Sequence, residues 1–320
     1  MKYSISYKSL YASLLGNDYV LSLLWVNFSN KCLINTNIRK LVMFIKKSGR
    51  KIVWIIGLVI LLLILTAFSG CFGKNGLRSI IIVGSTTVLP IAQEAADNWL
   101  DNHPEDNIGI SPGGSTVGVK SVGEGTADIG LSSRELKSYE ISEFPNLKQF
   151  VIAKDGIALI VNKANRITNL NIEQVRKIYS GQYSNWQNLG GPDLVIEVIG
   201  RDTASGTRTS FDELVMADKE VISSMKTKNS NGAVHTTVRE TPGAIGYVSL
   251  GYVDDAVKGL KINGVDPTVK NIQDGNYTLS RNLSMFTDGE PQGLAKEFIT
   301  FVLSEEGQSI IEKEGFVPLK

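Results

Sequence analysis

Three times in this 320-residue chain, an apolar strand-like segment runs into a loop of glycine, serine and threonine, and an amphipathic helix pattern follows. The strand-like segments cover residues 79–83, 107–111 and 194–199, and the first reads SIIIV. A short apolar run of this kind is typical of a strand buried on both faces. Strands that alternate with helices predict an α/β fold in which the sheets are mainly parallel.

Two glycine-containing apolar segments, residues 155–162 and 243–249, bracket a middle block of the chain. We interpret them as crossings between two lobes, which a chain of this length can form as two domains of ordinary size. We therefore expect one lobe from residues 71–156 and 243–320 and a second from residues 157–242. The lobes would move by hinge bending at the two crossings, near Asp155–Gly156 and Gly243–Ala244.

Upstream of these segments, residues 52–70 carry no charge, and four basic residues lie just before them, between 46 and 51. This order is that of a secretory signal or a signal anchor. Residues 68–71 (FSGC) resemble a lipoprotein cleavage box and predict a lipid on Cys71, although Phe68 stands where such boxes have Leu, Val or Ile. The alternative is an uncleaved membrane helix, for which about 20 residues suffice. Both interpretations place the remaining chain outside the cytoplasm.

The segment before this signal fits it poorly, because a signal ordinarily begins the chain. Met43 would begin an ordinary signal, so we interpret residues 1–42 as a gene-model extension or a disordered leader. The competing interpretation is a first membrane segment over residues 10–28. Asn17 and Asp18 in its middle argue against that interpretation.

Composition argues against several classes of protein. The net charge is +1, which gives no support for a nucleic-acid partner. No cysteine follows Cys71, so the exported part must be stabilised by its own core rather than by disulfides. The whole chain has two histidines, His103 and His235. We therefore expect neither a metal site nor a cofactor.

The three loops carry the chemistry that a tetrahedral oxyanion requires. Residues 84–87 (GSTT), 112–116 (PGGST) and 200–207 (GRDTASGT) offer hydroxyl donors together with backbone N–H groups at helix starts. One such loop is weak evidence, because serine and threonine are common helix N-caps. Three loops at strand-to-helix transitions favour an anion site, since ligands of open α/β sheets bind at the carboxyl ends of strands.

Two charged residues refine this hypothesis. Arg201 could place its guanidinium fork on two oxygens of an anion, or it could be a surface residue paired with Asp202. Asp128 lies in residues 127–134 (ADIGLSSR). A carboxylate beside an anion is favourable only when the ligand has a proton to donate, as hydrogen phosphates do and sulfate at neutral pH does not. The alternative role for Asp128 is that of a helix or turn cap.

Five motifs in order resemble those of the phosphate-binding component of the high-affinity phosphate ABC importer. They occupy residues 84–91, 113–118, 127–134, 201–208 and 241–247. The likeness spans residues 78–320. It implies a two-lobed periplasmic-binding-protein fold of type II, in which each lobe is a mainly parallel sheet flanked by helices and one phosphate binds in the cleft.

The resemblance also implies a set of ligand contacts. The hydroxyl and backbone donors would come from Thr86, Thr87, Ser115, Ser205, Gly206 and Thr207, with Arg201 as the charged clamp and Asp128 accepting the ligand's proton. Supporting positions around them would be Ser85, Thr116, Ser132, Ser133 and Arg134. Ala204 stands where the family often has glycine, which we expect to change the affinity only modestly.

The expected function is that of an anchored, monomeric binding protein at the cell membrane, which captures inorganic phosphate and delivers it to ABC permease subunits for import. An anchored sensor, or a binder of another tetrahedral oxyanion, is an alternative with the same fold. A phosphate-ester hydrolase is disfavoured, because no motif links His103 or His235 to a serine nucleophile and no cluster of metal ligands is visible. We therefore expect no enzymatic activity.

Overall fold

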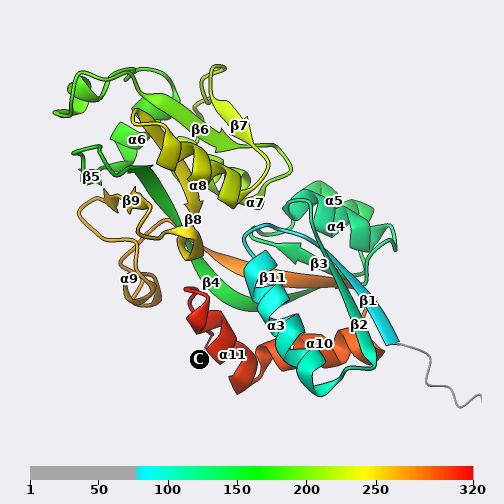
Figure 1. Cartoon of the computed structure of the whole chain (residues 1–320). Helices are drawn as coiled ribbons and strands as arrows, with labels where there is room; N and C mark the ends of the chain where they lie inside the picture. The colour runs from blue at the N-terminus through cyan, green and yellow to red at the C-terminus, as the bar shows by residue number, and fades with distance from the viewer. Residues whose placement is uncertain (1–77, 320) are drawn as a thin grey trace, which may run out of the picture. The chain divides into compact units, whose positions relative to one another are not determined.

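A computed structural model describes residues 78–319 (Figure 1). The strands are β1 Arg78–Gly84, β2 Asp106–Pro112, β3 Ile129–Ser132, β4 Leu147–Asn162, β5 Asn169–Leu170, β6 Glu197–Arg201, β7 Lys226–Lys228, β8 Ala244–Ser249, β9 Val257–Gly259, β10 Lys261–Ile262 and β11 Ser280–Asp288. The helices are α3 Leu89–Asn102, α4 Ser115–Gly123, α5 Ser138–Glu143, α6 Ile172–Tyr179, α7 Gly206–Phe211, α8 Asn231–Glu240, α9 Val269–Gln273, α10 Gly293–Leu303 and α11 Glu305–Lys313. Shorter helical turns are η1 Trp186–Leu189, η2 Asp212–Met216, which is a π-helix, and η3 Leu250–Tyr252.

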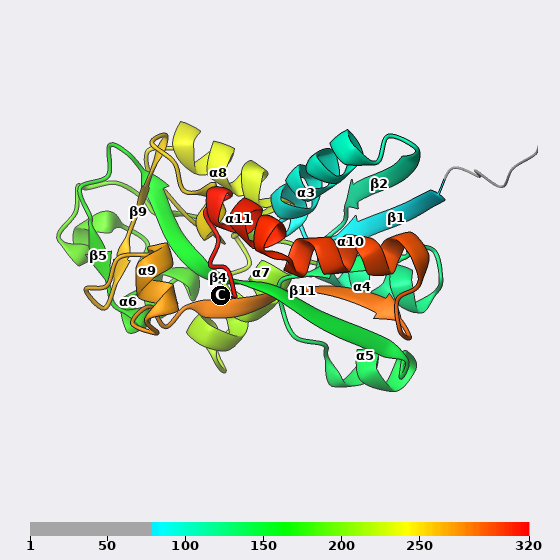
Figure 2. The same ribbon diagram turned by 90° about the horizontal axis from the view of Figure 1, so that it is seen from below.

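In the first lobe, β1 lies between β2 and β3, and all three strands are parallel. The crossover helices α3 and α4 therefore pack on opposite faces, since βαβ connections are right-handed. The central strand β1 buries Ile80 and Ile82, and its neighbour β3 is buried along its whole length. Helices α10 and α11 pack beside α3, where Phe298 and Ile311 complete the core (Figure 2).

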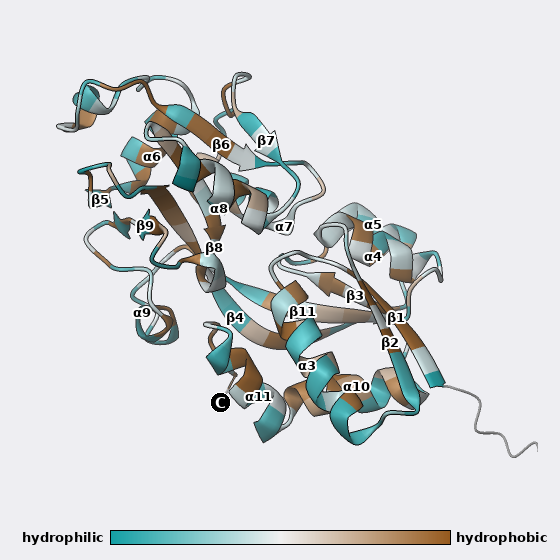
Figure 3. Cartoon of the chain, in the orientation of Figure 1, coloured by the Kyte–Doolittle hydropathy of each residue, from teal (hydrophilic) through white to brown (hydrophobic). Residues whose placement is uncertain are grey.

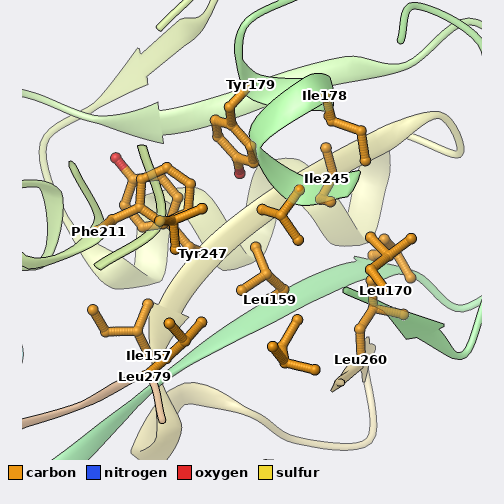
Figure 4. Packing of buried hydrophobic residues seen from close by; sticks show 14 of the residues in the cluster. Ile157, Leu159, Leu170, Ile178, Tyr179, Phe211, Ile245, Tyr247, Leu260 and Leu279 are labelled. Carbon is orange, nitrogen blue, oxygen red and sulfur yellow. The ribbon is translucent and has the colours of Figure 1, made fainter. Parts of the chain in front are cut away.

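In the second lobe, β8 pairs with β4 and β6, and β6 pairs with β7. Hydrophobic residues, drawn in brown, run along β6, β8 and the second-lobe part of β4 (Figure 3). Helix α8 covers a small cluster that includes Ile160, Ile199 and Val234. The larger cluster lies on the other side and contains Tyr179, Phe211 and Tyr247 (Figure 4).

The second lobe extends further along the chain than the sequence predicts. Ile245, Tyr247, Leu260 and Leu279 are buried in the same cluster as Tyr179 (Figure 4). The expected return to the first lobe at residue 243 is therefore wrong, and residues 244–279 pack with the second lobe. The physical reason is that β8 is a buried strand of this lobe's sheet, paired with both β4 and β6, rather than a connection.

Strands β4 and β11 pass between the lobes (Figure 2). Strand β4 pairs with β11 up to Gly156 and with β8 from Ile157 onward, so it leaves the first lobe at Asp155–Gly156. The chain returns where β11 begins at Ser280, directly after Leu279 of the second core. The second crossing is thus at the start of β11 and not at the expected Gly243–Ala244.

None of the helices in residues 78–319 is both long and apolar enough to cross a membrane. The predicted anchor at 52–70, the predicted lipid site at Cys71 and the predicted leader at 1–42 lie outside the described residues.

Candidate anion-binding site

Loops from the two lobes meet at the carboxyl ends of their strands. In the first lobe, Gly113 N and Gly114 N donate to Gly84 O at 2.8 and 2.9 Å, which ties the loop after β1 to the start of α4. Gly114 has a φ of +87°, and a Cβ there would lie 2.6 Å from Ala204 O. Because Ala204 belongs to the loop before α7, two of the predicted loops face each other across the lobes.

Serine hydroxyls of the first lobe form one buried cluster. Ser85 Oγ donates to Ser133 Oγ at 3.0 Å. Ser133 N donates to Ser115 Oγ at 3.0 Å, and the two hydroxyl oxygens are 3.4 Å apart. All three side chains are buried. The loop after β1, the start of α4 and the end of β3 therefore contribute to one site, as the motif order predicts.

Residues of the second lobe approach this cluster directly. Thr207 Oγ1 lies 3.1 Å from Thr87 Oγ1, and Thr116 N donates to Ala204 O at 3.1 Å. A Cβ on Gly206 would lie 2.2 Å from Ser115 Oγ, so this approach requires a glycine. The predicted residues of the first, second and last loops are thus brought together.

Ser205 also performs the ordinary capping role that was the alternative for these loops. Its Oγ accepts a hydrogen bond from Arg208 N at 3.2 Å, which makes it the N-cap of α7. Its side chain is nevertheless buried beside Gly206 and Thr207 at the contact between the lobes. Capping and an anion site are therefore compatible at this helix start.

Arg201 is a buried residue and not the surface residue of the alternative interpretation. Its side chain is 1% exposed, and its Nε and Nη2 donate to Lys228 O and Asn229 O at 3.2 and 3.1 Å. The Asp202 carboxylate is 3.9 Å away, beyond hydrogen-bond distance. Burial lowers the pKa of the Arg201 guanidinium. The end of β6 therefore holds a buried positive charge, which the Asp202 carboxylate compensates from 3.9 Å without a hydrogen bond.

Asp128 does not join this site, which corrects the expected role of its carboxylate. It is exposed and precedes β3, where its Oδ2 accepts a hydrogen bond from Ile81 N at 2.7 Å. The clustered Ser133 follows the other end of β3. The four residues of β3, at about 3.3 Å each, separate the two positions. The carboxylate is a cap on the backbone of β1, so it cannot accept a proton from a ligand in the loop cluster.

Arg134 stabilises the segments that carry the clustered serine hydroxyls. Its guanidinium forms a buried ion pair with Glu140 at 2.6 Å and donates to Thr116 Oγ1 at 3.0 Å. Burial favours the neutral form of Glu140, but hydrogen bonds from Arg134 and Lys137 N hold the pKa of that carboxyl below its usual value. Ser132 Oγ donates to Arg134 O at 2.8 Å. These residues fix the turn after β3 and the start of α4.

Asn231 belongs to the site, but the sequence analysis missed it. Its side chain is fully buried at the start of α8. Its Nδ2 donates to Thr87 Oγ1 at 2.9 Å, and its Oδ1 accepts from Ser249 N at 3.2 Å. The segment before it is the short, polar strand β7, which lacks the apolar run that marks the other loops. A polar loop followed by the N-cap Ser230 was the available signal.

A second missed residue is Arg281, near the start of β11. Its guanidinium donates to Asp155 Oδ2 through Nε and Nη2 at 3.0 and 2.7 Å. The same Nη2 lies 3.3 Å from Thr87 Oγ1. No glycine-rich motif marks this arginine, because β11 reaches the site through sheet pairing with β4 and not through a loop.

The two histidines have partners outside the loop cluster. His235 Nε2 lies 2.8 Å from Asp254 Oδ1, and the ring of His103 stacks on Trp99 with the centroids 4.1 Å apart. The described contacts therefore give neither histidine a link to Ser115 or Ser205.

Comparison with known proteins agrees with this geometry. Residues 73–306 match the family model of the PBP superfamily domain. The phosphate-binding protein PstS of Bacillus subtilis is 34% identical over 243 residues, which cover 75% of this chain and 81% of that protein. The chain belongs to the PstS family of phosphate-binding proteins. The PstS of Borreliella burgdorferi is 31% identical over 275 residues, covering 82% of this chain and 98% of that relative.

Solved structures give the same result. A phosphate ABC transporter substrate-binding protein from Clostridium perfringens, solved with bound phosphate, is 37% identical with a TM-score of 0.73 and covers 76% of this chain and 100% of that chain. A phosphate transport receptor from Vibrio cholerae is 37% identical with a TM-score of 0.63, covering 74% and 99%. The predicted two-lobed PBP fold is confirmed. These relatives are named as binding proteins or receptors, not as enzymes.

Proposed function

We propose that this protein captures inorganic phosphate between its two lobes and delivers it to the permease of an ABC transporter. The observation that carries the proposal is the convergence of donors from both lobes. Thr87 Oγ1 and Thr207 Oγ1 are 3.1 Å apart, and Gly206 lies against Ser115. The names of the PstS relatives and the phosphate bound in the Clostridium perfringens structure support phosphate as the ligand.

Residues of both lobes would bind the phosphate. The first lobe would contribute Thr86, Thr87 and Ser115, and the second Arg201, Ser205, Gly206 and Thr207. Hydroxyl and backbone donors of this kind can surround a tetrahedral anion, while a buried arginine compensates its charge. Removing one charged donor leaves ligand charge unpaired, so we expect an Arg201→Ala variant to bind phosphate at least about tenfold more weakly.

Binding and transport would be linked by closure of the lobes. The crossings at Asp155–Gly156 and at the start of β11 allow a hinge motion, and a permease could distinguish the closed form from the open one. In this proposal the protein acts as a monomer outside the cytoplasm. It would be tethered by a lipid on Cys71 or by an uncleaved helix over residues 52–70. It would bind phosphate without transforming it.

Titration calorimetry of the purified protein with phosphate, sulfate and molybdate tests the proposed ligand. We expect one phosphate per chain and tighter binding of phosphate than of the other two anions. Absence of phosphate binding would refute the proposal.

Uptake of labelled phosphate by cells that lack this protein tests the transport role. Unchanged uptake in such cells would favour the sensor over the importer.

A further inference from the structure

The guanidinium of Arg281 lies beside the loops of the proposed phosphate site and has an N–H donor without an acceptor among residues 78–319. The Arg281 side chain is 5% exposed, and its Nη1 has no hydrogen-bond partner among residues 78–319. Buried polar groups are rarely left unpaired, and the penalty is largest for a charged group. A bound ligand could therefore supply the acceptor that this nitrogen lacks.

The position of this donor is fixed by its neighbours. Nη1 and Nη2 are bonded to the same carbon, and Nη2 is 3.3 Å from Thr87 Oγ1. Thr87 is also the side chain that meets Thr207 and Asn231 of the second lobe. The Arg281 guanidinium consequently lies beside Thr87, one of the residues of the proposed phosphate site.

Asp155 holds the Arg281 guanidinium in place, and its carboxylate has no free acceptor position for a ligand. Its Oδ2 accepts the two hydrogen bonds from Arg281, and its Oδ1 accepts from Ser249 Oγ and Leu250 N at 2.8 and 3.1 Å. A carboxylate offers about four acceptor positions, so all of them are occupied. Asp155 and Arg281 are also direct cross-strand partners on β4 and β11.

The two guanidiniums of this region differ in how closely a carboxylate pairs with them: Asp155 lies 2.7 Å from Arg281, and Asp202 lies 3.9 Å from Arg201. The Arg201 and Arg281 side chains are 1% and 5% exposed, and among residues 78–319 the ion-pair partner of Asp155 is Arg281. Burial lowers the pKa of both guanidiniums, and the charge of Arg281 further lowers the pKa of Arg201. Two buried cations near each other favour a multiply charged anion between them.

We propose that Arg281 is a second arginine of the phosphate site. Its Nη1 donates to an oxygen of the bound phosphate, and Asp155 is the residue that positions it. This inference rests on the proposed function, and it adds a contact from the strand on which the chain returns to the first lobe. The ligand would thereby bridge both lobes and one of their two crossings.

The test is phosphate calorimetry on wild type and on Arg281→Gln, Arg281→Lys, Asp155→Asn and the double variant Asp155→Asn/Arg281→Gln. We expect Arg281→Gln to bind phosphate about 10- to 100-fold more weakly, the range for loss of a charge-assisted hydrogen bond. Arg281→Lys keeps the positive charge but lacks the two-pronged guanidinium, so its phosphate affinity should fall less than that of Arg281→Gln. The matched control is Arg176→Gln, which removes a half-buried arginine paired with Glu173 on α6 and should leave affinity unchanged.

A double-mutant cycle separates positioning from a structural role. If Asp155 acts through Arg281, Asp155→Asn weakens binding in wild type and has no further effect when Arg281 is already glutamine. The double variant removes both charges together, so it remains testable where Arg281→Gln leaves Asp155 uncompensated and unfolds. If wild type binds phosphate and both the double variant and Arg281→Lys match it within threefold, this inference is overturned. If wild type itself does not bind, the proposed function fails instead.

Discussion

At the residue scale, position along a strand decides which side chains can meet a bound anion. Asp128 and Ser133 flank β3, but only Ser133 contacts the hydroxyl cluster. The sequence predicts a ligand contact from Asp128 and a supporting position for Ser133 in the same motif. Asp128 and Ser133 are close in sequence, but the full length of β3 separates them.

Substituting Asp128 tests this correction. We expect Asp128→Asn to leave both the phosphate affinity and the preference over sulfate unchanged within about twofold, or 0.4 kcal/mol. Asparagine keeps an acceptor for Ile81 N, so the stability should change little. Competition calorimetry with phosphate and sulfate measures both quantities. A variant that no longer discriminates the two anions would restore the carboxylate to the site.

Gly206 provides a steric test of the contact between the lobes. A methyl group there would lie 2.2 Å from Ser115 Oγ and 2.7 Å from Ser133 Oγ. Gly206 does not have a positive φ, so alanine suits its backbone. Overpacking costs about 1 to 3 kcal/mol, and we expect Gly206→Ala to weaken phosphate binding by about 5- to 150-fold.

The matched control for this substitution is Gly232→Ala, in α8. A Cβ at Gly232 meets no atom within 4 Å of it among the described residues. We expect this variant to bind phosphate like wild type. Thermal unfolding without ligand should be little changed in both variants, because the Gly206 clash arises only when the lobes meet. Equal phosphate affinity of Gly206→Ala and wild type would show that the lobes do not close as described.

At the scale of elements, apolar runs predicted β1, β2 and β6 together with the loops that follow them. They could not predict which lobe a buried strand joins. Strand β8 has the glycine-led apolar pattern expected of a crossing, yet both of its neighbours lie in the second lobe. The loop before α8 was missed for the opposite reason, since the polar β7 carries no apolar signal. The place of β8 and of the loop after β7 depends in both cases on pairing between strands that are distant in the sequence.

Helix α5 illustrates how an element outside the site supports it. Glu140 of α5 pairs with Arg134, and the side chains are 3% and 2% exposed. Breaking a buried pair on one side costs about 3 to 5 kcal/mol, because the partner charge is left uncompensated. We expect Glu140→Gln to lower the free energy of unfolding by roughly this amount, as measured by urea denaturation.

The same pair predicts a pH dependence with a definite sign. The pKa of Glu140 is lowered in the folded protein, so its ionised form adds stability above its ordinary value of 4.5. That stability is lost as the pH falls through the folded pKa. Wild type should therefore lose its stability advantage over Glu140→Gln on acidification below about pH 4.5. A difference that stays constant down to pH 3 would contradict the ion pair.

At the scale of the whole molecule, the lobes are joined by direct hydrogen bonds as well as by two strands. The hydroxyl of Tyr252, on η3 of the second lobe, donates to Thr86 O of the first lobe at 2.7 Å. Burial raises the pKa of this phenol to about 12, so it remains a protonated donor at all physiological pH values. This bond exists only while the lobes touch, and it therefore favours closure.

Removing this hydroxyl should shift the molecule toward an open form. A neutral hydrogen bond contributes about 1 kcal/mol, so we expect Tyr252→Phe to weaken phosphate binding by about fivefold, equally at pH 6 and pH 9. Small-angle X-ray scattering without phosphate should show a larger radius of gyration than wild type. The control is Tyr277→Phe, which loses a hydrogen bond to Ile157 O within the second lobe. It should lower the stability without opening the lobes. Identical scattering and affinity for Tyr252→Phe and wild type would mean that the two strands and the ligand set the closure alone.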